Sequence, residues 1–511
     1  MSGTVINIIP AEVLQKGWPS GWARALLALL AVSIGLAIAY LPLWWAALVL
    51  LAVTLMVLTL IEPLVGLGVL LLIGPTKPLT DYFVPELPLD LGQLALIGTL
   101  GAWLLHAVWR RRPVPRSPLS LPLFIFMGAA GLSVFQALSL GFALKELIKW
   151  AQVLLVMWLV IDLAGPRRWG AVMGMILAAA AIQALIGVWQ FGLRGEGPEH
   201  FRILGDRFYR AYGTFEQPNP YGGFIGLTLP LSLGLAFAGM ERWGQPLLDH
   251  WRARSPRRLV DLARTSIDRH LLGWIGLGAL SALLASALLM SWSRGAWLGF
   301  GAAIWVLLFA WPRRTWVGLA LGLGAVVASL IALRFHLLPA VLVERLTSFS
   351  EFVQTFDVRG VDITPQNYAV LERLAHWQAA QEMARYHLWL GVGLGNYEPV
   401  YPGYALINWP QALGHAHNIY LNLLAETGIV GLVAYLALWV TIFWQTWLVT
   451  RRAVLWPRGI AVGLLGTWTH LSVHGLLDKL YVANLHLHIG ALLGILSILT
   501  ALKQEDVVPG D

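Results

Sequence analysis

Two histidines stand where a long polar segment gives way to an apolar one. The sequence His415-Ala416-His417-Asn418 precedes an apolar run that starts at 428. Histidine is the usual proton acceptor near neutral pH, so His417 could be a base. It could also be a hydrogen-bonded histidine at an interface. A metal pair is less favoured, because residues two apart lie on different faces of a helix and no carboxylate or cysteine partner is evident.

Arg210 lies in a loop punctuated by glycine and proline that leads into the next apolar run at Asn219. Asn219 stands between two prolines and is a natural turn and helix-capping residue. The arginine could contact the phosphate of a lipid at a membrane surface. Alternatively, it could be directed at a bound anion.

Arg294 is the only charged residue between His270 and Arg313, and it follows Ser293 directly. A charged side chain within an apolar run is costly in a membrane and is therefore a functional candidate. An arginine at a helix end can instead extend to the lipid headgroups. Serine and arginine at a helix N-terminus could together bind phosphate, because free N–H groups and the helix dipole favour anions.

Other polar residues leave two interpretations open. Lys145 and Lys149 are four residues apart and share one side of a helix, where they could bind pyrophosphate or simply lie at an interface. Glu426 could be a partner of the histidine motif or a helix cap. The remaining histidines of the C-terminal apolar runs are interpreted as structural rather than as a proton path: His470, His474, His486 and His488.

Composition places these residues in an integral membrane protein. Of 511 residues, 58% are hydrophobic and only 12% are charged, whereas a soluble domain carries about 25% charge. Apolar runs of about 20 residues recur, long enough to cross a bilayer, and they are continuous rather than alternating, so helices are expected and not a β-barrel. The absence of cysteine excludes disulfides, thiolate metal sites and a cysteine nucleophile. Basic loops explain the net charge of +8 without nucleic acid.

We predict an all-α polytopic membrane protein with about 12–14 transmembrane helices and one large extracytoplasmic loop. Residues 1–118 form N-terminal helices, 119–334 central helices with Arg210 and Arg294, 335–427 the large loop, and 428–511 C-terminal helices. An amphipathic helix that lies at the membrane interface is expected at 367–383 within the loop. The candidate spans are 22–40, 42–60, 62–75, 92–109, 121–141, 146–164, 168–191, 219–239, 270–291, 295–312, 315–334, 428–448, 456–476 and 483–502.

Arginines orient these spans. They gather in alternate loops, at 110–116, 167–168, 242–269, 313–314 and 451–458. Short basic loops remain in the cytoplasm, which predicts cytoplasmic termini and an extracytoplasmic position for His417, Arg210 and Arg294. The loop 192–218 departs from this rule with four arginines, which a bound anion would explain. The first 20 residues lack a cleavable signal pattern.

The chain resembles the O-antigen ligase and O-antigen polymerase superfamily of bacterial membrane glycosyltransferases. The likeness extends from about 200 to 445 and is diffuse elsewhere. Its motifs are Arg210 with Gly213-Thr214-Phe215 and Pro218-Asn219, Ser293-Arg294-Gly295-Ala296-Trp297, His417-Asn418 with Gly428 and Gly431 at fixed spacing, and Gly391-Val392-Gly393-Leu394-Gly395-Asn396-Tyr397.

The resemblance implies transfer of a glycan from undecaprenyl-pyrophosphate to a hydroxyl acceptor, such as lipid A core, at the periplasmic face of the bacterial inner membrane. It implies no nucleotide sugar, cofactor or metal. Arg210 and Arg294 would bind the pyrophosphate, and His417 would activate the acceptor, with inversion at the transferred sugar. Further candidates for substrate binding are Lys145, Lys149, Asn219, Ser293, His415 and Asn418.

Two groups of alternatives remain. Within the superfamily, the protein could be a surface-polysaccharide polymerase or a protein O-oligosaccharyltransferase, because the motifs do not read the acceptor. From another class, it could be an inorganic-carbon (bicarbonate) transporter. A transporter predicts paired broken helices near the middle of two related halves, a pattern that the sequence does not show. A purely structural scaffold would not explain Arg294.

Overall fold

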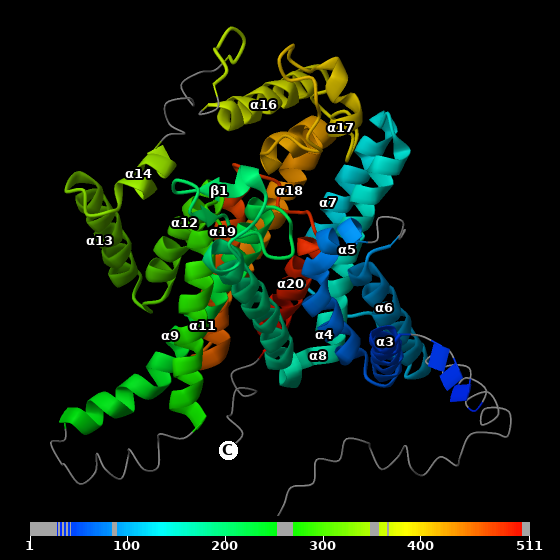
Figure 1. Ribbon diagram of the computed structural model, residues 1–511. Coiled ribbons are helices and arrows are strands. Elements are labelled where there is room, and N and C mark those ends of the chain that lie inside the picture. Colours follow the sequence, from blue (N-terminus) through cyan, green and yellow to red (C-terminus); the bar gives the residue numbers. More distant parts are fainter. Residues whose placement is uncertain are drawn as a thin grey trace, which may run out of the picture.

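The computed structural model describes residues 42–83, 89–252, 269–347, 357–364 and 367–502, with a few positions between 28 and 40. Eight of the described helices are long and apolar enough to cross a membrane, and three shorter apolar helices accompany them. These helices form a bundle, and α16 and α17 lie above one of its ends (Figure 1). The predicted all-α polytopic membrane fold is confirmed. The predicted span 22–40 lies largely outside the described residues.

The helices of the bundle follow the predicted apolar runs closely. Two antiparallel strands of two residues each, β1 and β2, form the only sheet among the described residues. The elements are α3 (Leu43–Ile61), α4 (Pro63–Ile73), η1 (Gly74–Thr76), α5 (Lys77–Phe83), α6 (Leu91–Trp109), α7 (Ser120–Ser133), η2 (Val134–Gln136), α8 (Leu140–Val188), η3 (Trp189–Leu193), η4 (Glu199–Phe201), β1 (Arg202–Ile203), β2 (Phe208–Tyr209), α9 (Pro218–Arg252), α11 (Arg269–Met290), α12 (Arg294–Ala310), α13 (Thr315–Arg334), α14 (Ala340–Thr347), α16 (Tyr368–Tyr386), α17 (Tyr397–Val400), η5 (Tyr401–Gly403), α18 (Ile419–Arg452), α19 (Leu455–His474) and α20 (Leu485–Ala501).

Two long helices are interrupted at glycine. In α8 the backbone leaves helical geometry at Gly165, where φ is 52°, so the predicted spans 146–164 and 168–191 are its two halves. In α18 the interruption is at Gly428, and a Cβ there would lie 2.3 Å from the carbonyl carbon of Trp389. The helix already begins at Ile419, before the predicted start at 428. The last residues assigned to the large loop are therefore helical and mostly buried.

The large loop carries helices of its own. The amphipathic helix predicted at 367–383 is found as α16. Its side chains Val370, Leu371 and Leu374 are buried in a cluster with Trp409 of the same loop. These apolar side chains are therefore covered by protein, and they hold α16 against the segment that leads to the histidine motif.

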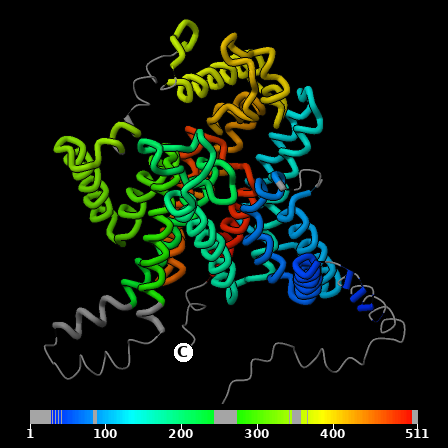
Figure 2. The backbone as a smooth tube through the Cα atoms, viewed as in Figure 1, coloured from blue at the N-terminus to red at the C-terminus, as the bar shows by residue number. Residues whose placement is uncertain are grey.

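Helices α19 and α20 run through the middle of the bundle (Figure 2). Close packing of α12 on α19 depends on two glycines. A Cβ on Gly295 would lie 2.4 Å from Cδ2 of His474, and one on Gly299 would lie 2.8 Å from the carbonyl oxygen of His470. Small residues permit such close helix contact. The start of α12, with Arg294, is thereby fixed beside the end of α19.

Several predicted basic loops meet at one end of the bundle. Arg458 pairs with Glu241 at 3.0 Å, and Arg451 donates to the carbonyl of Pro312 at 3.0 Å. The first contact joins the start of α19 to α9, and the second joins the end of α18 to the residues that follow α12. The first residues of α9, α12 and α18 lie at the opposite ends of these helices, where the candidate site is formed. The arginines of 253–268 lie outside the described residues.

Candidate active site

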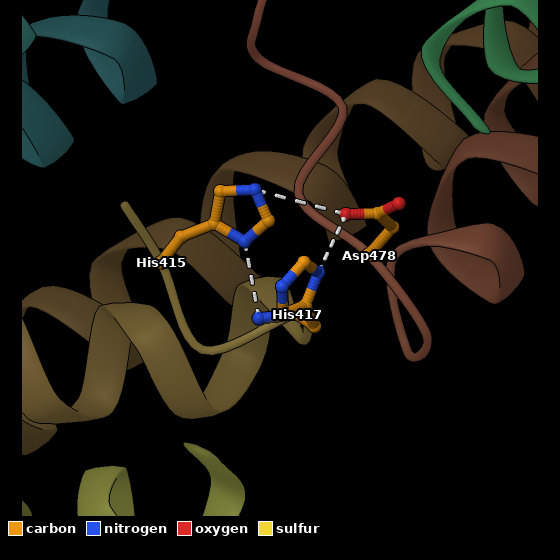
Figure 3. Close-up of side chains that lie close together, drawn as sticks. All are labelled: His415, His417 and Asp478. Atoms are coloured by element: carbon orange, nitrogen blue, oxygen red, sulfur yellow. Dashed lines mark hydrogen bonds and ion pairs between the residues drawn. The ribbon is translucent and has the colours of Figure 1, made fainter. Parts of the chain in front are cut away.

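His417 lies beside a carboxylate that is distant in sequence (Figure 3). Its Nδ1 is 3.4 Å from Oδ1 of Asp478, and Nε2 of His415 is 3.8 Å from the same oxygen. Asp478 belongs to the connection between α19 and α20. The expectation that the histidines have no carboxylate partner is therefore wrong, because the partner comes from another segment and sequence spacing gives no signal for it.

Hydrogen bonds on both sides of His417 fix its backbone. Asn418 caps α18, and its Oδ1 accepts from the N–H groups of Tyr420 and Leu421 at 3.0 and 3.1 Å. The N–H of Ile419 donates to the carbonyl of Gly475 at 2.8 Å. The backbone φ angle of His417 is 50°, a value that residues with a Cβ rarely adopt. Such backbone strain persists only where surrounding contacts hold the residue in place, and it is often found at functional sites.

A hydrogen bond also assigns the proton of the His415 ring. Nδ1 of His415 accepts from the backbone N–H of His417 at 3.1 Å, so the proton of a neutral His415 ring is on Nε2, facing Asp478. Burial and the neighbouring His417 lower the pKa of His415 to about 3, so it is neutral at pH 7. A proton on Nδ1 of His417, the nitrogen that lies 3.4 Å from Oδ1 of Asp478, would leave Nε2 of His417 as the proton acceptor.

Asp478 is held as a carboxylate. Burial alone would raise its pKa, but the interaction with His417 at 3.4 Å and the positive charge of Arg373 bring its pKa below the usual range. The two histidines and Asp478 could in principle ligate a metal ion. The assigned proton instead favours a hydrogen-bonded group, because the atom of His415 that faces Asp478 carries hydrogen.

Four arginines line a cavity of about 200 Å³ next to this group. Two of them, Arg210 and Arg294, were predicted from the sequence. The other two, Arg345 on α14 and Arg373 on α16, come from the large loop and were missed. The described residues that line the cavity include no carboxylate: Arg210, Asn219, Ser293, Arg294, Gly295, Arg345, Ala369, Val370, Arg373, His474 and Leu477.

The turn before α12 orients two of the arginines. Nε of Arg210 donates to the carbonyl of Ser291 at 3.1 Å, and Arg345 donates to the carbonyl of Trp292 at 3.3 Å. A second donor of Arg210 contacts Oδ1 of Asn219 at 3.3 Å. Ser293 caps α12, its Oγ accepting from the N–H of Ala296 at 3.4 Å. The first turns of α9 and α12 thus reach the cavity through Asn219 and Ser293.

The loop that carries Arg210 is anchored by two buried glutamines. Oε1 of Gln190 accepts from the N–H groups of Tyr212 and Gly213 at 3.1 and 2.7 Å. Oε1 of Gln183 accepts from the N–H of Thr214 at 3.0 Å. Both residues were overlooked, although amides within the otherwise apolar run 168–191 were a usable signal.

Replacing Gln190 by leucine should lower both thermal stability and donor affinity. Each buried N–H that loses its acceptor costs about 1–3 kcal/mol, and the loop then holds Arg210 less firmly. We expect a lower Tm and a higher KM for the donor, measured on purified protein. Gln136→Leu, at an exposed position, is the matched control. Unchanged Tm and KM in the Gln190 variant would contradict this role.

The positive charges in the cavity oppose one another. Burial, together with the charges of Arg345, Arg373 and Arg294, lowers the pKa of Arg210 to about 9. Burial and the charges of Arg294 and Arg373 lower the pKa of Arg345 to about 10. An anion would relieve this repulsion and accept bidentate hydrogen bonds from the guanidinium groups. Nε of Arg373 and Nδ1 of His474 are buried without a hydrogen-bond partner among the described residues.

The cavity and the histidine–aspartate group adjoin one another. His474 and Leu477 line the cavity, and Asp478 follows in the same turn, its N–H donating to the carbonyl of His474 at 3.1 Å. The charge of Arg373 also contributes to the lowered pKa of Asp478. One turn of the chain therefore connects the four-arginine cavity with the His417–Asp478 pair.

Lys145 and Lys149 do not line this cavity. Lys145 is exposed, and Lys149 pairs with Glu146 of the same helix. Of the histidines interpreted as structural, His474 lines the cavity, whereas His486 contacts Gln152 at 2.7 Å.

Comparison with known proteins bears on this arrangement. No curated protein matches the chain. The family model described as O-antigen ligase matches residues 279–436, a range that contains Arg294 and His417. The resemblance to the O-antigen ligase superfamily is therefore confirmed over residues 279–436 of this membrane protein.

Proposed function

We propose that the protein transfers a glycan from undecaprenyl-pyrophosphate to a hydroxyl acceptor, as an O-antigen ligase-like glycosyltransferase. The observation that carries this proposal is the position of the four-arginine cavity directly beside the His417–Asp478 pair. The four-arginine cavity suits a pyrophosphate, and the His417–Asp478 pair suits a hydroxyl that must lose a proton. The family match supports a lipid-linked glycan as the donor.

The arginines would act on the leaving group. When the bond between the anomeric carbon and the phosphate oxygen breaks, its electron pair stays on the pyrophosphate. Fixed guanidinium groups that already surround this position stabilise the developing charge without reorganisation. Arg210, Arg294 and the N-terminus of α12 would contribute from the helix bundle, and Arg345 and Arg373 from the large loop.

His417 would act on the acceptor. Its Nε2 takes the hydroxyl proton as the acceptor oxygen forms a bond to the anomeric carbon, and Asp478 stabilises the resulting imidazolium. A single displacement on the face opposite the pyrophosphate inverts the configuration of the transferred sugar. Base catalysis of this type contributes about 10²–10⁴-fold. The proposed chemistry needs neither metal nor cofactor.

We place the site on the periplasmic face of the inner membrane, with cytoplasmic termini, because the basic loops gather at the other end of the bundle. The acceptor could be lipid A core, a growing surface glycan or a protein hydroxyl, so polymerase and protein O-oligosaccharyltransferase remain alternatives. A bicarbonate transporter is less well supported, because the described charges of the site lie at one end of the bundle and not at its middle.

Purified protein in detergent, supplied with undecaprenyl-pyrophosphate glycan and candidate acceptors, tests the proposal. We expect product with inverted anomeric configuration, identified by NMR, and full activity in EDTA. The same glycan on undecaprenyl monophosphate should be a much poorer donor. A retained configuration, or activity that depends on added divalent metal, would overturn the mechanism.

A further inference from the structure

A lysine with a buried side chain lies next to Asp478. The side chain of Lys479 is only 8% exposed, and its Nζ is 3.6 Å from Oε2 of Glu146, itself 14% exposed. Glu146 also pairs with Lys149 on the same helix. The charge of Glu426 acts on Lys479 as well. Two acids and two lysines thus form a compact group outside the arginine cavity.

This group joins three segments of the chain. Glu146 is on α8, Lys479 is in the connection between α19 and α20, and Glu426 is on α18. A buried ion pair adds little to the free energy of unfolding compared with apolar packing of the same size. Removing one partner is nevertheless strongly destabilising, because it leaves a buried charge without compensation. Its main effect is therefore to fix the relative position of the segments that it joins.

The same lysine holds the carboxylate of Asp478. The backbone N–H of Lys479 donates to Oδ1 of Asp478 at 2.8 Å, and this oxygen is the one that faces Nδ1 of His417. Lys479 therefore links Glu146 to the carboxylate of Asp478: its side chain pairs with Glu146, and its backbone N–H donates to Asp478. A shift of Lys479 would turn the carboxylate relative to the imidazole ring.

We propose that Glu146 is a positioning residue that acts through Lys479 to hold the carboxylate of Asp478 against His417. This inference rests on the proposed function, because it assigns Glu146 to the proton acceptor of that reaction. Glu146 does not line the arginine cavity. Its replacement should therefore alter turnover and leave donor binding unchanged.

Glu146→Gln should lower kcat about 10–100-fold, because small displacements of catalytic groups have effects of this size. The KM for the donor should stay within about twofold, since no arginine is affected. Glu62→Gln is the matched control, because Glu62 forms an exposed pair with Arg168 near the other end of the bundle, and it should retain wild-type kcat. A fall in donor affinity equal to the fall in kcat would contradict a positioning role.

Two double variants separate positioning from folding. The double variant Glu146→Gln/Lys479→Met removes both charges of the pair. Its Tm should therefore recover relative to Glu146→Gln, while its kcat stays low. Recovery of both Tm and kcat would overturn the inference. In a His417→Ala background, Glu146→Gln should have no further effect on kcat, and an additive loss would overturn it as well. If His417→Ala abolishes turnover but Glu146→Gln retains the wild-type kcat, the inference about Glu146 fails and the proposed function stands. Full activity of His417→Ala would defeat the proposed function itself.

Discussion

His417→Ala is expected to lower kcat by about 10²–10⁴-fold, which is the usual contribution of a general base. The acceptor hydroxyl would still reach the anomeric carbon, but no group would take its proton. The KM for the donor should change little, because the four arginines are intact. Steady-state rates with a labelled lipid-linked donor, measured over a range of donor concentrations, provide the test.

Asp478→Asn distinguishes a base supported by a carboxylate from a base that acts alone. The amide keeps the size of the side chain but loses the charge that orients Nδ1–H of His417, so kcat should also fall by about 10²–10⁴-fold. His200→Ala, at an exposed position in the loop before α9, is the control and should match the wild type. Wild-type kcat in either the His417 or the Asp478 variant would refute the proposed proton transfer.

Arg294→Lys and Arg210→Lys are each expected to lower kcat by about 10²–10³-fold, the usual cost of losing one donor to a developing negative charge. Lysine keeps the positive charge but lacks the planar fork that binds two phosphate oxygens. A large fall in kcat in these variants, which keep the positive charge, would show that the planar geometry of the guanidinium group is needed as well as its charge. Rates and donor KM for these variants give the comparison.

The loop arginines should behave differently from those of the bundle. Arg345 and Arg373 come from α14 and α16 of the large loop, and their replacement by lysine should raise the KM for the donor more than it lowers kcat. Arg385→Lys is a suitable control, because Arg385 is exposed on α16 and pairs only with Glu382. Wild-type kinetics in all four lysine variants would contradict the assignment of the cavity to the pyrophosphate.

Much of the fold was predictable because each membrane span carries its own signal. A run such as 315–334 must satisfy its backbone hydrogen bonds internally in lipid, so apolar length alone indicates a helix. The predicted start of the C-terminal helices at 428 was later than the observed start of α18 at Ile419, because the first residues of α18 include Asn422 and Glu426. These polar side chains are buried by the large loop, a contact that hydropathy cannot register.

The site was predictable where a residue conflicts with its surroundings. Arg294 lies in an apolar run, Arg210 lies in a basic loop that departs from the predicted charge rule, and His417 lies within a recognisable motif. The structure brings these residues to one end of the bundle together with Asn219, Ser293, His415 and Asn418, whereas Lys145 and Lys149 do not line the arginine cavity. The lysines satisfied the helical spacing, but Glu146, three residues before Lys149 on the same helix, pairs with Lys149.

The sequence by itself determined the membrane class, the spans, and the three residues whose charge or motif is unusual for its position. Only the tertiary structure decided that Asp478 supports His417 and that Arg345 and Arg373 complete the anion cavity. The physical reason is that hydropathy and periodicity depend on neighbours along the chain. The grouping of charged side chains depends instead on neighbours in space, and here those neighbours come from α14, α16 and the connection between α19 and α20.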